Sequence, residues 1–248
     1  MIKFFRDLRK KLLADQRIGN YLIYALGEVI LIVVGILLAL QIDAWKQNRD
    51  DRDTERLLMS ELNKEFRANK KQWDTTIYYH RNALKSAEYL DSQLPIKLNE
   101  VNLDSIAYHI YQLTWVFTFN PSNGVSQSIL SNSTFQIITN DELRQLLITW
   151  NDVLVDYQEE EIRAFNNYEN QLKPFLKRNV LFTDDLEQAL GDPRVDLSFL
   201  ETLEFDNFVM DRYLDLDEIL NNVTGELELI ESTIDRIIEL SDPSLYKN

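Results

Sequence analysis

Residues 21–42 read YLIYALGEVILIVVGILLALQI, a stretch that is almost entirely apolar. At about 1.5 Å of rise per residue, a helix of this length crosses a hydrocarbon core of about 30 Å. A secretory signal peptide also places an apolar run after basic residues, but that run is about half as long and ends at a small-x-small cleavage site. Bulky neighbours surround Ala39, so no such site follows here. The stretch is predicted to be an uncleaved transmembrane helix.

The charges are distributed unevenly on the two sides of this stretch. Residues 1–20 carry a net charge of +4, whereas residues 43–248 carry −18. The positive-inside rule therefore predicts a cytoplasmic N-terminus and a large acidic part across the membrane. Because an acidic surface repels phosphate, nucleic acid is not expected as a partner. Solubility is the simplest reason for the excess of acidic residues.

The composition favours helices. The chain has no cysteine, which excludes a disulfide scaffold and thiol chemistry, and it has only 6 glycines and 5 prolines in 248 residues. So few turn-forming residues argue against a β-rich domain. We therefore expect an all-α protein, in which an N-terminal transmembrane helix is followed by a long helix and an antiparallel helical bundle.

Five parts are expected along the chain. They are a basic amphipathic cytoplasmic segment (1–20), the transmembrane helix (21–42), a charged stalk (43–57), a helical domain (58–241) and a tail (242–248). The first segment can lie in the lipid headgroups or serve only as the signal that sets the topology, and both interpretations remain open.

The transmembrane stretch contains one acidic residue, Glu28, which is costly in hydrocarbon. Ile32, Gly35 and Ala39 follow on the same helical face, and Gly35-x-x-x-Ala39 is a small-x-x-x-small pair that lets a second helix approach closely. This face predicts self-association or pairing with another membrane protein. For Glu28, a hydrogen bond between helices, a proton or ion pathway, and snorkelling to the cytoplasmic headgroups all remain open.

Basic and aromatic side chains flank the stretch and predict contact with the lipid bilayer. Trp and Tyr favour the interface between membrane and water, and Lys and Arg favour the cytoplasmic side. The residues expected at this interface are Lys10, Lys11, Arg17, Tyr21, Tyr24 and Trp45.

Apolar residues then recur at steps of three and four, which predicts one buried face of a long helix that ends before Pro95. The members of this stripe are Leu58, Leu62, Phe66, Asn69, Trp73, Ile77, His80, Leu84 and Ala87. His80 is interpreted as a hydrogen-bonded core histidine, because a metal site would need further His or Cys ligands and the only other histidine is His109.

Four further helices are predicted. Residues 101–119 are expected to form a buried helix, although their aromatic and β-branched side chains also suit a strand. A short helix over 125–130 follows, and Thr139 and Glu142 form a capping box that begins a helix running to Pro174. The last helix, over 206–240, carries a heptad seam of Leu216, Leu220, Val223, Leu227, Ile230, Ile234 and Ile237.

No motif predicts a catalytic, cofactor-binding or metal-binding residue. The chain lacks a phosphate-binding glycine loop, a nucleophile elbow and zinc-ligand spacing, so an enzyme is not expected. Two or more carboxylates converging near His80 or His109 would revive that hypothesis. The run Glu159-Glu160-Glu161 is interpreted as a solvated helix face, because adjacent residues diverge around a helix.

The N-terminal part resembles a family of small single-pass membrane proteins of Gram-negative bacteria, known only as a domain of unknown function. The matching residues include Met1–Arg6, Lys11-Leu12-Leu13, Tyr21–Glu28 and Gly35–Trp45, with a weaker match over 128–143. Asp43-Ala44 departs from the Asn-Asn expected before Trp45. The resemblance implies no activity, but it implies an inner-membrane anchor with a periplasmic domain.

These patterns lead to two functional hypotheses. The first is a membrane-anchored interaction or scaffold protein, which oligomerises or pairs through its transmembrane helix and docks onto an envelope component. The alternative is a periplasmic sensor or regulatory subunit of a membrane partner, since helical bundles transmit small shifts. A proton- or ion-linked assembly built on Glu28 is a variant of the first hypothesis.

Overall fold

The structure is a computed structural model that describes Arg6, Lys10 and residues 18–181, 183, 189–221 and 224–246, without the side chains of 18–21 and 133. The chain divides into two compact units, Met1–Thr54 and Glu55–Asn248. The expected all-α class is confirmed, because the described residues form helices and no β-strand. The predicted amphipathic segment, 1–20, falls mostly outside the described residues and stays a prediction.

The longest element, α2 (Ile18–Ser92), belongs to both units. In the first unit it contains a stretch that is long and apolar enough to cross a membrane, and none of that stretch is buried. In the second unit the predicted apolar stripe is confirmed: Leu62, Phe66, Asn69 and Trp73 are at most 2% exposed. Glu55 is 2% exposed as well, so the end of the predicted charged stalk lies inside the second compact unit.

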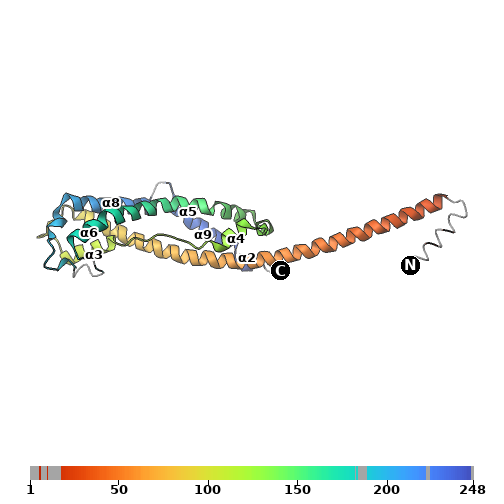
Figure 1. The fold of residues 1–248 in the computed structure, drawn as a ribbon, viewed down its shortest axis with the longest axis horizontal. Coiled ribbons are helices and arrows are strands. Elements are labelled where there is room, and N and C mark those ends of the chain that lie inside the picture. Colours follow the sequence, from red (N-terminus) through yellow and green to blue (C-terminus); the bar gives the residue numbers. More distant parts are fainter. Residues whose placement is uncertain are drawn as a thin grey trace. The chain divides into compact units, whose positions relative to one another are not determined.

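The second unit is a helical bundle built on α2, α5 (Asp141–Asn167), α8 (Leu203–Asn221) and α9 (Glu226–Leu240) (Figure 1). Both α8 and α9 pack along α5. The short elements are α3 (Leu103–Leu113), α4 (Gly124–Ser131), α6 (Lys173–Asn179), the 3₁₀ turns η1 (Ser133–Ile137), η3 (Leu197–Glu201) and η4 (Pro243–Tyr246), and the π-turn η2 (Tyr168–Leu172).

The direction of each helix follows from its contacts. Phe66 packs edge-to-face on Trp150, and Trp73 packs on Tyr157 seven residues further along both helices, so α2 and α5 run parallel. In contrast, Lys70 pairs with Glu231 on α9, and Asn63 binds the backbone of Ile238, so α9 is antiparallel to α2. The bundle is therefore antiparallel at α9 but parallel between α2 and α5.

A parallel pair of helices needs a connection that returns along its length, and residues 114–123 provide it. The predicted helix over 101–119 is wrong in its second half: α3 ends at Leu113, and residues 115–123 have no regular secondary structure. We call residues 114–123 the connecting segment; it runs from α3 back towards α4 (Figure 1). Its aromatic side chains face the helices, since Phe119 packs against Trp73 and Phe117 stacks on Tyr79.

The predicted capping box of α5 is wrong by one residue. Asn140, not Thr139, is the N-cap, because its side chain accepts the Leu143 N–H at 2.9 Å. The Thr139 backbone N–H and hydroxyl instead donate to Glu55 on α2, at 2.6 and 2.8 Å. A contact with another helix has replaced the local capping bond.

The predicted end of this helix at Pro174 is also revised. Proline lacks an N–H and cannot make the usual helical bond, and the chain accommodates it through the π-turn η2 before continuing as α6 to Asn179. The predicted last helix is in fact two helices, α8 and α9, separated by Gly225, whose φ of 75° is left-handed. The seam residues that are described are buried, whereas Val223 lies outside the described residues.

Gly225→Ala is expected to lower the free energy of unfolding by about 1–2 kcal/mol, because an L side chain at this φ clashes with the backbone. Chemical denaturation of the full chain would measure it. The matched control is Gly124→Ala at the start of α4, where a Cβ would lie 3.9 Å from Glu65 Oε2, an ordinary contact. Equal effects of the two substitutions would show that the left-handed conformation is not what matters at Gly225.

Candidate functional site

The residues predicted for helix pairing lie on the exposed surface of α2 in the first unit. Ile32 is 56% exposed, Ala39 is exposed, and a Cβ added to Gly35 would meet nothing within 4 Å. Glu28 is half-buried, and it lines a surface hollow together with Tyr24, Gly27, Leu31 and Ile32. Glu28 and its neighbours thus form one open, mainly apolar face.

The predicted interface residues are only partly described. Trp45 is 66% exposed, Lys10 is exposed, and Tyr24 is half-buried. Lys11, Arg17 and the Tyr21 side chain lie outside what the structure describes.

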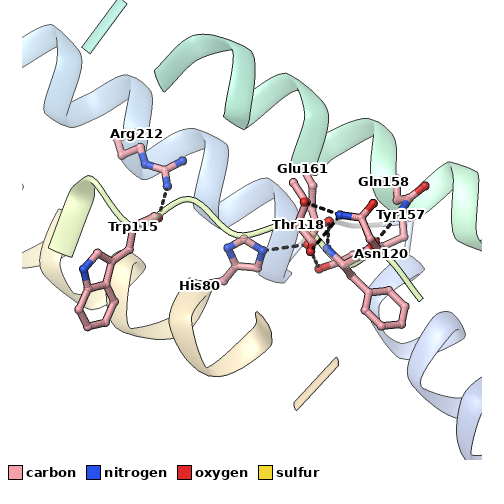
Figure 2. A network of polar contacts seen from close by, with 9 residues as sticks. His80, Trp115, Thr118, Asn120, Tyr157, Gln158, Glu161 and Arg212 are labelled. Atoms are coloured by element: carbon pink, nitrogen blue, oxygen red, sulfur yellow. Dashed lines mark hydrogen bonds and ion pairs between the residues drawn. The ribbon is translucent and has the colours of Figure 1, made fainter. Parts of the chain in front are cut away.

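In the second unit, a buried polar network surrounds Glu161 on α5 (Figure 2). Glu161 is 1% exposed, so its interpretation as part of a solvated face is wrong, whereas Glu159 is indeed exposed. Glu161 Oε1 accepts the Tyr157 hydroxyl at 2.9 Å, and Oε2 accepts the Phe119 backbone N–H at 2.7 Å. The sequence held a signal for this burial, because Glu161 follows Tyr157 by one helical turn on the apolar stripe.

His80 contacts the same carboxylate from α2. Its Nε2 lies 2.9 Å from Glu161 Oε1 and the residue is 2% exposed, which confirms the interpretation as a hydrogen-bonded core histidine. An ionised Glu161 requires His80 to donate from Nε2, and Nδ1 then has no hydrogen-bond partner among the described residues. Burial and the Glu161 charge raise the pKa of Tyr157, which keeps this hydroxyl protonated as a donor.

Side chains from three helices hold the connecting segment. Gln158 Nε2 donates to the Phe119 carbonyl at 2.6 Å, next to the bond from Phe119 N–H to Glu161 (Figure 2). The Asn69 amide bonds both polar groups of the Ser122 backbone, accepting from its N–H at 2.9 Å and donating to its carbonyl at 2.7 Å. These bonds replace the ladder that a β-strand would have made with a neighbouring strand.

Arg212 on α8 holds the beginning of the same segment. It donates to the carbonyls of Leu113 and Trp115 at 3.2 and 2.9 Å, and it is 3% exposed. Burial lowers its pKa to about 10, and the nearby Asp215 opposes that shift. Burial also raises the pKa of Asp215, which accepts two hydrogen bonds from Asn167 at 3.0 and 3.1 Å.

Glu65, also on α2, caps the N-terminus of α4. Its carboxylate accepts the backbone N–H groups of Val125 and Ser126 at 2.7 and 3.0 Å, at the helix end where negative charge is favoured. The polar residues of α2 thus bind backbone at successive levels, from Glu55 through Glu65 to Asn69.

The second histidine, His109, lies on α3. Its Nδ1 is 3.0 Å from Ser86 Oγ, and its ring stacks on Tyr89 with centroids 3.9 Å apart. Burial lowers its pKa, so the imidazole stays neutral near pH 7.

These contacts have a structural role rather than a chemical one. His80 and Glu161 are both almost fully buried, so a substrate cannot reach them in this structure. Within the described ranges, no three His, Asp or Glu side chains form a group that could hold a metal ion. What the arrangement does is position the connecting segment between α2, α5 and α8.

No family model, curated protein or solved structure matches this chain. The resemblance to the Gram-negative membrane family therefore stays a prediction.

Proposed function

We propose that this protein is a single-pass, membrane-anchored interaction protein. In this proposal the face of Glu28, Ile32, Gly35 and Ala39 pairs with a second copy or another membrane protein, and the helical domain docks onto an envelope component. The observation that carries the proposal is the exposed apolar surface of α2 between residues 22 and 42. Almost every large apolar side chain there is about half exposed or more, from Leu22 at 61% to Ile42 at 67%.

The energetic argument concerns solvent. Apolar surface stabilises a protein by about 25 cal/mol for each Å² removed from water, and monomeric soluble proteins rarely expose contiguous apolar patches beyond a few hundred Å². A helix with this much exposed apolar surface is expected to be solvated by lipid. Within lipid, small residues such as Gly35 and Ala39 favour close packing of helices, and a polar group such as Glu28 favours a hydrogen bond across the pair.

The proposed location is the bacterial inner membrane, with the N-terminus in the cytoplasm and the second unit in the periplasm. It is supported by the +4 and −18 net charges on the two sides of the apolar stretch and by the family resemblance. Protease added to spheroplasts is expected to degrade the chain beyond Trp45. Protection of that region would contradict the orientation.

Gly35→Leu and Glu28→Ala are each expected to weaken self-association of the full chain in detergent about tenfold, which corresponds to about 1.4 kcal/mol. Analytical ultracentrifugation over a range of detergent concentrations would measure the change. Leu37→Ala, on the opposite face of the helix, is the control and should have little effect. Glu28→Gln should retain pairing, because its amide can still form a hydrogen bond between helices.

Unchanged oligomer size for both Gly35→Leu and Glu28→Ala would contradict homotypic pairing through this face. Co-purification from native membranes, followed by mass spectrometry, would then identify a different membrane protein as the partner.

A further inference from the structure

One face of α2 in the helical domain carries exposed cations that form no ion pair in the described structure. Lys71, Tyr78 and Lys85 are seven residues apart and therefore lie in one line along the helix, with Arg81 beside it. All four are exposed, Tyr78 at 60%. We call these four residues the basic strip.

The basic strip is unusual for this domain. Between Glu55 and Tyr246, every other described Lys or Arg forms an ion pair or another polar contact. Among these residues, only the three cations of the basic strip form none. They are therefore available to an acidic partner.

A complementary face lies on α5. Ile148, Val155 and Ile162 are also seven residues apart, and they are 52%, 44% and 53% exposed. Asp152 and Glu159 lie between them, are exposed, and make no ion pair or side-chain hydrogen bond in the described structure. We call these five residues the acidic strip. Together they combine apolar area and negative charge, with the same seven-residue spacing as the basic strip.

The two strips point away from each other within one chain. Trp73 and His80 face α5, and they lie on the side of α2 opposite Tyr78. Tyr157 and Glu161 face α2, and they lie on the side of α5 opposite Val155. The basic strip of one chain can thus meet an acidic strip only on a second chain.

The axial positions of the strips overlap in part. The helices α2 and α5 run parallel, and three of their contacts join positions 84 residues apart, so Lys71 lies about level with Val155 and Tyr78 with Ile162. At the same offset, Arg81 and Lys85 lie beyond the end of the acidic strip. If a second copy stands beside the first at the same height, Lys71 falls between the levels of Asp152 and Glu159. Tyr78 then faces the apolar side chain of Ile162. Without an axial shift, Lys71 and Tyr78 of the basic strip thus meet the acidic strip.

We propose that the basic strip of one copy binds the acidic strip of a second copy, side by side and in parallel. This inference rests on the proposed membrane anchoring, which would hold copies at one height and raise their effective concentration. The contact is heterologous, so a pair of copies keeps one free basic strip and one free acidic strip. Such contacts form a ring if the rotation closes and an open array if it does not.

The chain has no cysteine, so disulfide trapping can test the contact and its register. The full chain carrying Tyr78→Cys and Ile162→Cys, reconstituted in lipid vesicles and oxidised, is expected to form a ladder of interchain disulfides. Tyr78→Cys alone should form far less, because the contact is not symmetric. The off-register control combines Tyr78→Cys with Ile148→Cys, two heptads away or about 21 Å along the helix, and should also form little.

A strong dimer from Tyr78→Cys alone, or equal ladders from both pairs, would overturn the proposal. The proposal would also be overturned if Tyr78→Cys with Ile162→Cys gave no ladder while the chain still associated. The ladder assay in a Gly35→Leu background separates the two interfaces: a lost ladder means that this contact depends on membrane-helix pairing, and a retained ladder means that it forms independently.

Charge reversal provides a second measurement without cysteines. Lys71→Glu is expected to weaken association of the helical domains about tenfold. The double variant Asp152→Lys, Glu159→Lys is expected to weaken it by a similar factor. All three changes in one chain should restore association, because the signs again match. Lys97→Glu, at an exposed cation that pairs with Glu100, is the control. If the chain with all three changes unfolds like the unchanged chain but does not recover association, the charge pairing is wrong.

Discussion

Glu161→Ala is expected to lower the free energy of unfolding of the helical domain by about 3–5 kcal/mol. The substitution removes the acceptor for the Phe119 N–H and the Tyr157 hydroxyl, and it leaves His80 Nε2 without its partner. All of these groups are buried, so water cannot readily replace the lost carboxylate. Equilibrium denaturation of the full chain in detergent, followed by circular dichroism, would measure the change.

The control for this prediction lies two residues earlier. Glu159→Ala removes an exposed carboxylate from the same helix and should change stability by less than about 0.5 kcal/mol. Glu161→Gln should cost less than Glu161→Ala, because its amide oxygen can still accept the bond from Phe119. If Glu161→Ala were as mild as Glu159→Ala, the network would not be what holds the connecting segment.

Arg212→Ala is expected to destabilise the domain by about 3 kcal/mol or more. The guanidinium donates to the carbonyls of Leu113 and Trp115, and its removal also takes away one of the two cations near the buried Asp215. The other cation, Arg163, lies 3.9 Å from Asp215 Oδ1. The effect should be local as well as global. Hydrogen exchange is expected to accelerate first in residues 114–119, where Arg212 holds the backbone.

A variant with a similar change in charge tests that specificity. Arg194→Ala removes an arginine that is 76% exposed and paired only with Asp192 in the described structure, and it should leave exchange in residues 114–119 unchanged. Uniform acceleration across the whole domain in Arg212→Ala would contradict a specific role at the connecting segment.

Local patterns predicted the elements whose own residues carry their stability. The apolar stripe of α2 from Leu62 to Ala87 is buried as expected, and the helix ends at Ser92 before Pro95. The short helix predicted over 125–130 is found as α4. In each case a repeat of three and four residues, or a nearby proline, is enough to specify the element.

The same reasoning failed where a distant residue competes with a local bond. Thr139 has the chemistry of an N-cap, but Glu55 takes its hydroxyl, and Asn140 caps the helix instead. Residues 114–119 have helical spacing, but Arg212 and Glu161 bind their backbone groups from other helices. Such bonds join positions 42 to 99 residues apart, which no local repeat encodes.

The sequence alone determined the helical class, the apolar stretch with its single acid, and the buried face of the long helix. These properties depend on composition and on the period of neighbouring side chains. The tertiary structure decided that α2 and α5 run parallel, that residues 114–123 return between them, and that Glu161 is buried while Glu159 is exposed. Those outcomes depend on which helix supplies a partner for each backbone N–H and carbonyl, and that choice exists only once the helices have packed.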